Sequence, residues 1–288
     1  MSERVIQADG VELATEAFGT PTDPPILLVM GVMASMLWWP DEFCTRLAAR
    51  GRYVIRYDNR DTGHSTNYEL GRPTYTLDDL VDDTMRVLDG YGLPAAHLVG
   101  MSMGGMIAQL ATLQYPTRVL SLTAISTTPV GRDNADLPGS DPALNAQSAD
   151  AAAIDWTARA SVIPHMVEES RLLSGTGRHF DLARTTAFVE RDYDRARNFA
   201  NSTNHTLLHG GERWQGRLNE LHRPLLVIHG TADPLFPIAH GVTLAGAVAG
   251  STLVRLEGGG HELHEDDWET IIAAIVGHTE TARRASAG

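Results

Sequence analysis

The chain has 288 residues, 43% of them hydrophobic and 20% charged, which suffices for one domain with a sizeable core and is short for two full-sized domains. Its 36 acidic residues exceed its 23 lysines and arginines, and the formal net charge of −13 argues against nucleic acid or an anionic membrane surface as a partner. The single cysteine, Cys44, excludes an internal disulfide and a multi-cysteine metal site.

The first ten residues, MSERVIQADG, lack a basic segment followed by an apolar one, so we expect no secretory signal and a cytoplasmic location. The apolar stretch 26–40 has 15 residues, against about 20 for a membrane span, and Gly31 and Ser35 interrupt it. We interpret it as a buried strand followed by an apolar loop.

Strand-like and helix-like segments alternate up to about residue 129. A turn signal at Asp9-Gly10, between two alternating segments, predicts a β-hairpin over 5–19. Apolar runs predict strands at 24–30, 52–58, 95–101 and 119–126. Amphipathic segments predict helices at 41–51, 77–92 and 103–115.

The pattern changes from about Val130 to Gly216, where helical patches occur without convincing strands, and alternation then resumes with strands at 224–230 and 251–258 and helices at 238–248 and 268–278. Such alternation predicts an α/β fold with a mostly parallel eight-stranded sheet flanked by helices. The expected parts are 1–129 and 217–288 as the core domain and 130–216 as a helical lid. The lid should cover the carboxyl ends of the strands, where such sheets bind ligands.

The sequence Gly100-Met101-Ser102-Met103-Gly104 lies between an apolar strand and an amphipathic helix and matches the pattern G-x-S-x-G. Small residues two positions before and after a nucleophile let the chain bend sharply, which exposes the serine hydroxyl beside a helix N-terminus. We therefore predict Ser102 as the nucleophile. The alternative is a glycine-rich turn with an incidental serine.

Asp233 and His261 are predicted to complete a catalytic triad. The order serine, acid, histidine is typical of this architecture; Asp233 follows the strand at 224–230, and His261 follows the strand at 251–258 after three glycines. Asp233 would orient the imidazole and stabilise the imidazolium. His264 could exchange roles with His261, whereas His229 is interpreted as a core or supporting residue and His64 as a loop residue.

We expect neither a metal nor a cysteine nucleophile. The histidines of His261-Glu262-Leu263-His264 are three positions apart, whereas the zinc motif H-E-x-x-H places them four apart. Cys44 falls inside a predicted helix, without a turn that would present a nucleophile.

Acyl transfer through a tetrahedral intermediate also needs two N–H donors for the developing oxyanion. We expect the backbone N–H of Met103 as the first donor and that of Val32, in the turn after the strand at 24–30, as the second. The apolar side chains proposed to line the substrate pocket are Met33, Met36, Trp38 and Trp39. For the two tryptophans, the alternative is that they only pack this loop against the lid.

Taken together, these motifs resemble the α/β-hydrolase superfamily over almost the whole chain. Within it, the segments MSERVIQADGVEL, LLVMG, WPDEF, RYDNRDTGHST and LSGTG (173–177) are similar to the aclacinomycin methylesterase family, which removes a methyl group from a carboxylate ester on an anthracycline. The resemblance implies the same triad of Ser102, Asp233 and His261, with Val32 and Met103 as oxyanion donors.

The sequence departs from these relatives in the oxyanion loop. Met30-Gly31 stands where His-Gly is common in the superfamily, and Val32-Met33 stands where the esterase family has Gly-Asn, so the shape of the acyl side should differ. The lid matches only in patches. Because lids set substrate range, the anthracycline itself is not carried over to this chain.

We predict a serine-dependent carboxylic-ester hydrolase that uses no cofactor and acts on a small hydrophobic ester, with a methyl ester of a polyketide as one candidate. A serine nucleophile excludes haloalkane dehalogenases and epoxide hydrolases, which need a carboxylate there. Open alternatives are a perhydrolase or cofactor-free haloperoxidase, a C–C bond hydrolase, a lactonase and a non-catalytic ligand-binding protein. No pattern indicates the oligomeric state.

Arginines are frequent in the predicted lid. They could receive a substrate carboxylate, but we interpret them as charges on solvated helix faces. They are Arg159, Arg171, Arg178, Arg184, Arg191, Arg195 and Arg197.

Overall fold

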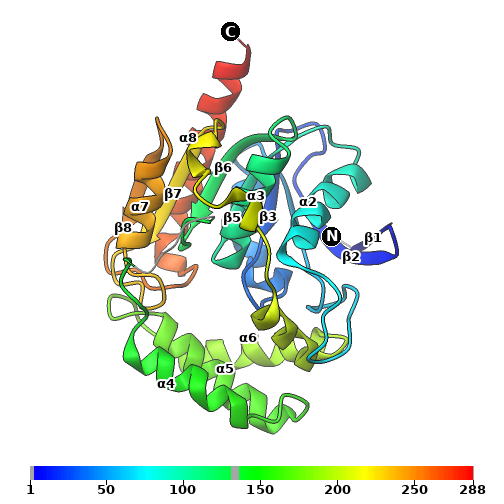
Figure 1. Cartoon of the computed structure of the whole chain (residues 1–288), viewed down its shortest axis with the longest axis vertical. Helices are drawn as coiled ribbons and strands as arrows, with labels where there is room; N and C mark the ends of the chain where they lie inside the picture. The colour runs from blue at the N-terminus through cyan, green and yellow to red at the C-terminus, as the bar shows by residue number, and fades with distance from the viewer. Residues whose placement is uncertain (1–2, 131–135, 288) are drawn as a thin grey trace.

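A computed structural model describes residues 3–130 and 136–287, and a twisted eight-stranded sheet forms its centre (Figure 1). The strand order is β1-β2-β4-β3-β5-β6-β7-β8. Strands β1, β2 and β4 pair antiparallel, and the remaining pairs are parallel, so the predicted mostly parallel sheet is confirmed. The strands are β1 (Arg4–Ala8), β2 (Val11–Phe18), β3 (Pro25–Val29), β4 (Tyr53–Tyr57), β5 (Ala96–Met101), β6 (Val119–Ile125), β7 (Leu225–Gly230) and β8 (Thr252–Leu256).

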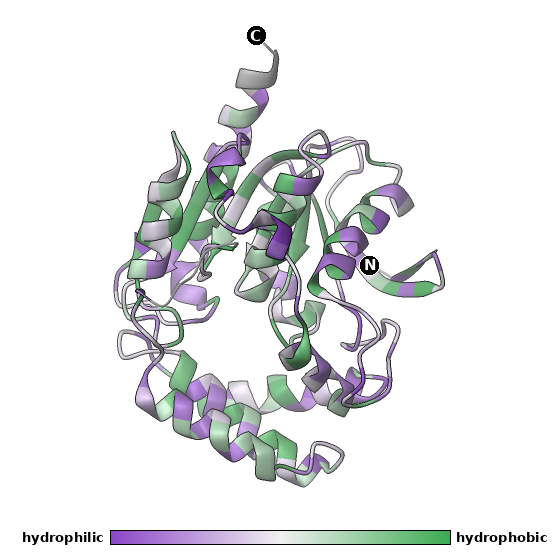
Figure 2. Cartoon of the chain, in the orientation of Figure 1, coloured by the Kyte–Doolittle hydropathy of each residue, from purple (hydrophilic) through white to green (hydrophobic). Residues whose placement is uncertain are grey.

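Helices cover both faces of the sheet. Helices α1 (Asp41–Ala48) and α8 (Trp268–Ala287) bury Phe43, Leu47 and Ile271 in the core on one face. Helices α2 (Leu77–Gly90), α3 (Met103–Gln114) and α7 (Ala239–Ala247) bury Leu80, Ile107 and Leu244 on the other. Figure 2 shows the central strands mainly in the hydrophobic colour, as expected of a sheet enclosed between two helical layers.

Local sequence signals account for several of these boundaries. Asp9 and Gly10 both have positive φ, at 52° and 80°, which is the backbone twist of a tight hairpin turn. Helix α2 begins with a capping box, in which the Thr76 hydroxyl accepts from the Asp79 N–H and the Asp79 carboxylate accepts from the Thr76 N–H.

The segment between β6 and β7 forms a separate helical layer over the carboxyl ends of the parallel strands (Figure 1). It contains α4 (Pro142–Asp150), α5 (Arg159–Leu173), α6 (Leu182–Arg195) and the 3-10 helix η3 (Phe199–Leu207). This layer, here called the lid, has its own small core around Val162, Val189 and Phe199. The shorter 3-10 helices of the chain are η1 (Met36–Trp38), η2 (Ala151–Ala153), η4 (Glu212–Trp214), η5 (Leu218–Glu220) and η6 (Glu265–Asp267).

The bounds predicted for the lid, 130 and 216, stay a prediction. Residues 131–135 lie outside the described residues, and the last part of the predicted lid already contacts the core. Leu208 and Trp214 pack against the core cluster, and the Gly211 N–H donates to Asp78 at the start of α2, at 3.0 Å.

None of the described helices is long and apolar enough to span a membrane.

Ion pairs join the lid to the core. Arg178 contacts Asp267 at 2.6 Å, Arg197 contacts Glu12 at 2.7 Å, and Arg184 pairs with Glu265. The Arg184–Glu265 and Arg197–Glu12 pairs are exposed and contribute little individually, about 0–1 kcal/mol each, whereas the side chains of Arg178 and Asp267 are mostly buried. Their arrangement shows that the lid arginines face protein carboxylates.

The loop after β3 returns to the core at Trp39. The Trp39 side chain is 0% exposed and lies 5.8 Å from the Phe43 ring, centroid to centroid, in the core beneath α1. Its predicted place in the substrate pocket is therefore wrong, because the ring is enclosed by core residues. The predicted packing against the lid holds only for its neighbour, since Trp38 packs edge-on against Phe188 of α6 at 4.9 Å.

Replacing Trp39 by alanine should lower the free energy of unfolding by about 3–5 kcal/mol, because a large buried ring leaves a cavity. Urea denaturation of Trp39→Ala measures this. Leu182→Ala, on the exposed face of α6, is the control and should change stability by less than about 0.5 kcal/mol. Similar losses in the two variants would contradict the assignment of Trp39 to the core.

Candidate active site

Ser102 occupies a sharp turn between β5 and α3. Its φ of 56° and ψ of −124° lie in a region that residues with side chains rarely adopt. Hydrogen bonds hold this conformation: the Ser102 N–H donates to Ile125 O at 3.0 Å, and the Ser102 carbonyl accepts from the Thr127 hydroxyl at 2.7 Å. The predicted nucleophile thus stands at the N-terminus of α3, whose first N–H groups have no partner within the helix.

Glycines allow three backbones to meet around this turn. A Cβ on Gly104 would lie 2.1 Å from Val29 O, and a Cβ on Gly100 would lie 2.2 Å from Gly104 O. A Cβ on Gly31 would lie 3.1 Å from the Cβ of Ser102. The turn after β3 is therefore pressed against Ser102, which is where the second oxyanion donor is expected.

The structure brings Asp233 and His261 together at the carboxyl ends of β7 and β8. His261 Nδ1 lies 2.9 Å from Asp233 Oδ2, and both side chains are buried. Asp233 Oδ1 accepts from the N–H groups of Leu235 and Phe236, which fixes the carboxylate. Burial alone raises the pKa of Asp233, but the charge and hydrogen bond of His261 outweigh it, so the pKa lies below its usual range and the group is a carboxylate at neutral pH.

The other candidate side chains lie elsewhere. The His264 ring contacts His179 O and accepts from the Asp266 N–H, so His264 does not exchange roles with His261. His229 is buried and lies 3.5 Å from Asp233 Oδ2, as expected of a supporting residue. Burial raises the pKa of Cys44 to about 12, which makes this thiol a poor nucleophile.

The oxyanion loop, residues 30–36, is held by side chains from other elements. The Asn59 amide donates to Met30 O at 3.1 Å, and Asp58 Oδ1 accepts from the Met36 N–H at 2.7 Å. From the lid, Asp192 accepts hydrogen bonds from the Ser35 hydroxyl and from the Trp38 indole N–H. The roles of Val32 and Met103 as donors, and of Met33, Met36 and Trp38 in the pocket, stay predictions.

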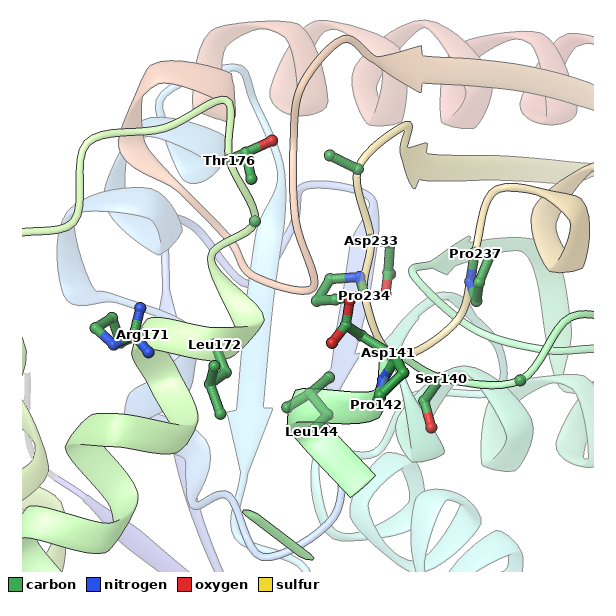
Figure 3. Close-up of a pocket in the computed structure, with 13 residues that line it drawn as sticks. Ser140, Asp141, Pro142, Leu144, Arg171, Leu172, Thr176, Asp233, Pro234 and Pro237 are labelled. Atoms are coloured by element: carbon green, nitrogen blue, oxygen red, sulfur yellow. The ribbon is translucent and has the colours of Figure 1, made fainter. Parts of the chain in front are cut away.

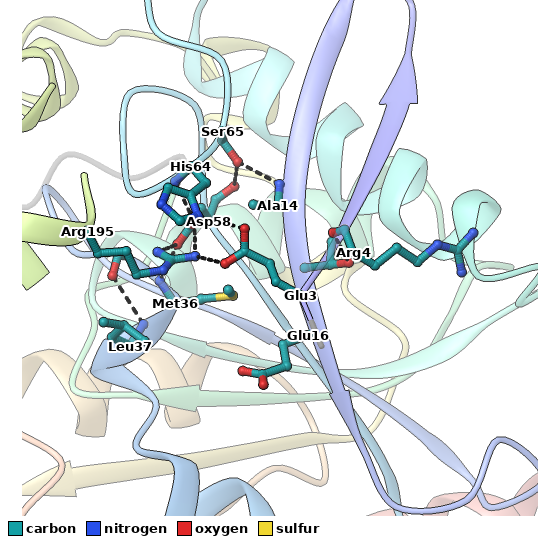
Figure 4. A network of polar contacts seen from close by, with 12 residues as sticks. Glu3, Arg4, Ala14, Glu16, Met36, Leu37, Asp58, His64, Ser65 and Arg195 are labelled. Atoms are coloured by element: carbon teal, nitrogen blue, oxygen red, sulfur yellow. Dashed lines mark hydrogen bonds and ion pairs between the residues drawn. The ribbon is translucent and has the colours of Figure 1, made fainter. Parts of the chain in front are cut away.

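Arg195 connects the lid to Asp58, the side chain that bonds the Met36 N–H of the same loop. Its guanidinium contacts Asp58 at 2.8 Å and Glu3 at 2.7 Å, as Figure 4 shows, and its side chain is only 13% exposed. The interpretation of the lid arginines as solvated charges is therefore wrong for Arg195. A buried charge of this kind needs a charged partner, and Asp58 supplies it.

Sequence reasoning missed the residues that support the oxyanion loop, namely Asp58, Asn59, Asp192, Arg195 and His205. A signal was present for two of them. Asp58 and Asn59 directly follow the buried strand β4, and polar residues at the carboxyl end of such a strand face the ligand-binding edge of the sheet.

A cavity of about 530 Å³ lies beside Asp233, between the lid and the core. Figure 3 shows Leu144 and Leu172 from the lid and Pro234 and Pro237 from the loop after β7 around this cavity, with Asp141 next to Pro234. Its wall is mixed: Leu144, Leu172 and several prolines supply apolar surface, and Asp141 and Arg171 supply charge.

Residues 24–267 match the family of the alpha/beta hydrolase fold. The chain therefore belongs to this family, and the predicted fold class is confirmed. Rhodomycin D methylesterase DauP of Streptomyces sp. (strain C5) is 35% identical over 98% of this chain and 99% of its own length. Rhodomycin D methylesterase DnrP of Streptomyces peucetius is 34% identical with the same coverage. The resemblance to methylesterases is confirmed by these relatives.

A solved structure shares the fold at lower identity. The 2-hydroxy-6-oxo-6-phenylhexa-2,4-dienoate hydrolase of Rhodococcus sp. strain RHA1 superposes with a TM-score of 0.78 over 97% of this chain and 98% of that chain. At 18% identity this likeness concerns the fold alone.

Gly104→Ala should lower the free energy of unfolding by about 1–3 kcal/mol and slow the reaction of Ser102 with a fluorophosphonate, because the new Cβ displaces the end of β3. The control is Gly246→Ala in α7, where a Cβ meets nothing within 4 Å and should leave stability equal or slightly higher. Denaturation and labelling rates of both variants test this. Unchanged labelling in Gly104→Ala would refute the close approach.

Burial raises the pKa of Asp192 from 3.8 to about 6, against the lowering effect of its hydrogen bonds from Ser35 and Trp38. Because its pKa is higher in the folded state, protonation of Asp192 stabilises the folded chain. This stabilisation is fully present below pH 3.8 and is lost as pH rises through about 6. Relative to Asp192→Asn, which does not titrate, the wild type should therefore lose up to about 3 kcal/mol between these pH values. Urea denaturation of both proteins across this range measures the difference, and a difference independent of pH would contradict the prediction.

Proposed function

We propose that this protein is a serine-dependent carboxylic-ester hydrolase whose substrate is a hydrophobic ester, with a methyl ester of a polyketide as the preferred candidate. The observation that carries the proposal is the placement of Ser102 in a strained turn at the same sheet edge as the hydrogen-bonded Asp233–His261 pair. The two methylesterases named above support the ester, because each aligns with this chain over nearly its full length.

In the proposed mechanism, His261 removes the proton of the Ser102 hydroxyl as its oxygen attacks the ester carbonyl. The negative charge on the former carbonyl oxygen is stabilised by the N–H groups of Met103 and Val32. His261, now an imidazolium beside the Asp233 carboxylate, protonates the leaving alcohol. Water then attacks the acyl-enzyme with His261 as base, which releases the acid and restores the serine.

Every proton and charge in this cycle is handled by side chains and backbone groups of the chain, so the proposal includes no cofactor. The cavity beside Asp233 offers apolar surface from Leu144, Leu172 and Pro237 to the hydrophobic part of such an ester, next to the charged side chains of Asp141 and Arg171. The cytoplasmic location and the absence of nucleic-acid and membrane partners stay predictions from the sequence.

Wild type, Ser102→Ala and His264→Ala should be compared with p-nitrophenyl butyrate and with the methyl ester of an aromatic polyketide acid, at neutral pH. Ser102→Ala should lose about 10⁴-fold or more in kcat/KM, because the nucleophile is absent. His264→Ala is the matched control and should stay within about threefold, since its ring contacts lid and loop backbone outside the Asp233–His261 pair.

Turnover that survives in Ser102→Ala would overturn the proposal. If the wild type lacks ester turnover but a fluorophosphonate still labels Ser102, the nucleophile is retained. The activity would then be that of a C–C bond hydrolase or a lactonase of the same fold. Absence of labelling would favour a ligand-binding protein.

A further inference from the structure

His205 is a buried histidine of the lid that the proposed reaction does not use. It lies in η3, is 4% exposed, and reaches the oxyanion loop and the loop after β4 at once. Its Nδ1 is 3.0 Å from the Met33 N, and its Nε2 is 2.7 Å from Arg60 O. Both ring nitrogens are thus engaged by backbone groups.

These two contacts define the protonation state of the ring. Arg60 O can only accept, so His205 Nε2 must carry a hydrogen; the Met33 N–H can only donate, so Nδ1 must be free of one. The two bonds exist together only for the neutral ring with its hydrogen on Nε2. Burial lowers the pKa of His205 to about 4, which keeps this form at neutral pH.

The bonded amide belongs to the peptide that directly follows Val32. Met33 has a φ of 59°, a left-handed conformation that is unfavourable for a residue with a side chain and that needs an external partner to persist. On the other side of Val32, Gly31 lies against Ser102, where a Cβ would come within 3.5 Å of Ser102 Oγ. Val32 is therefore held between a fixed contact with the nucleophile and a fixed bond to the lid.

We propose that His205 is a positioning residue for the oxyanion hole: by accepting the hydrogen bond of the Met33 amide, it holds the turn that directs the Val32 N–H toward the carbonyl attacked by Ser102. The inference rests on the proposed serine hydrolase function. It makes a lid residue part of the catalytic apparatus, so that the hole is complete only when the lid is docked.

The position of the charge in the reaction sets the expected effect. Negative charge develops on the carbonyl oxygen in the transition state and is small in the bound ester. Loss of the bond to Met33 should therefore lower kcat and leave KM almost unchanged. A purely structural role would lower the amount of folded protein without changing kcat per active site.

Two substitutions divide the contacts of the ring between them. His205→Asn places an amide oxygen near the position of Nδ1 and keeps the acceptor for Met33, whereas His205→Gln places an amide nitrogen near Nε2 and keeps the donor to Arg60 O. We expect kcat to fall roughly 10- to 100-fold in His205→Gln and to stay within about threefold in His205→Asn. The control His209→Gln, on an exposed side chain just after η3, should match the wild type.

Rates are measured with p-nitrophenyl butyrate and are normalised to active sites titrated with a fluorophosphonate, so that misfolded molecules do not count. Equal kcat values in the two variants, or a change confined to KM, would overturn the role of His205. If His205→Gln does not fold, His205→Asn decides alone, and a loss of tenfold or more there overturns it.

The proposed function and this inference fail separately. If the wild type lacks ester turnover, the rate of phosphonylation of Ser102 replaces kcat, because attack on phosphorus uses the same donors. An unlabelled Ser102 overturns the proposed function together with the role of His205. Normal labelling of Ser102 at equal rates in His205→Gln and the wild type overturns only the role of His205.

Discussion

The close approach of three backbones at the carboxyl ends of β3 and β5 is the constraint on which the site depends. Gly100 and Gly104 let the first turn of α3 contact the end of β3, and Gly31 brings the following loop against Ser102. The strained conformation of Ser102 is stable because its amide and its carbonyl are both bonded to the β6 edge, at Ile125 and Thr127. Core packing in this region therefore determines where the nucleophile and its donors lie.

The fold, the sharp turn at Ser102 and the Asp233–His261 contact could be predicted because their signals are local. A strand, a glycine-flanked serine and a helix occur within a few residues, and Asp233 and His261 each follow a strand in the expected order. The supports of the oxyanion loop could not be predicted in this way. Asp192 contacts Ser35 across 157 positions of sequence, and His205 contacts Met33 across 172, so only the folded chain brings them together. Trp39 was misassigned because an apolar side chain in a loop can line a pocket or enter the core, and composition does not distinguish the two.

Two buried carboxylates, Asp58 and Asp192, lie between the lid and the core. Asp58 is fully buried, and its carboxylate pairs with Arg195 of the lid and accepts from the N–H groups of Met36 and His64. Its charge is therefore compensated by groups from the lid and from two core loops. Asp192, also buried, instead keeps a raised pKa. The contact between the lid and the oxyanion loop thus contains two buried carboxylates, of which Asp58 is well compensated and Asp192 is poorly compensated.

The end of α5 also constrains how this family can diversify. Leu173 O accepts from the His261 N–H at 2.7 Å, and a Cβ on Gly260 would lie 2.3 Å from the same oxygen. Gly177 approaches Gly258 so closely that a Cβ would lie 2.1 Å from its carbonyl oxygen. The segments 173–177 and 258–261 therefore form one unit, although they are separate in sequence. A chimaera that receives a foreign lid must therefore exchange both segments or neither.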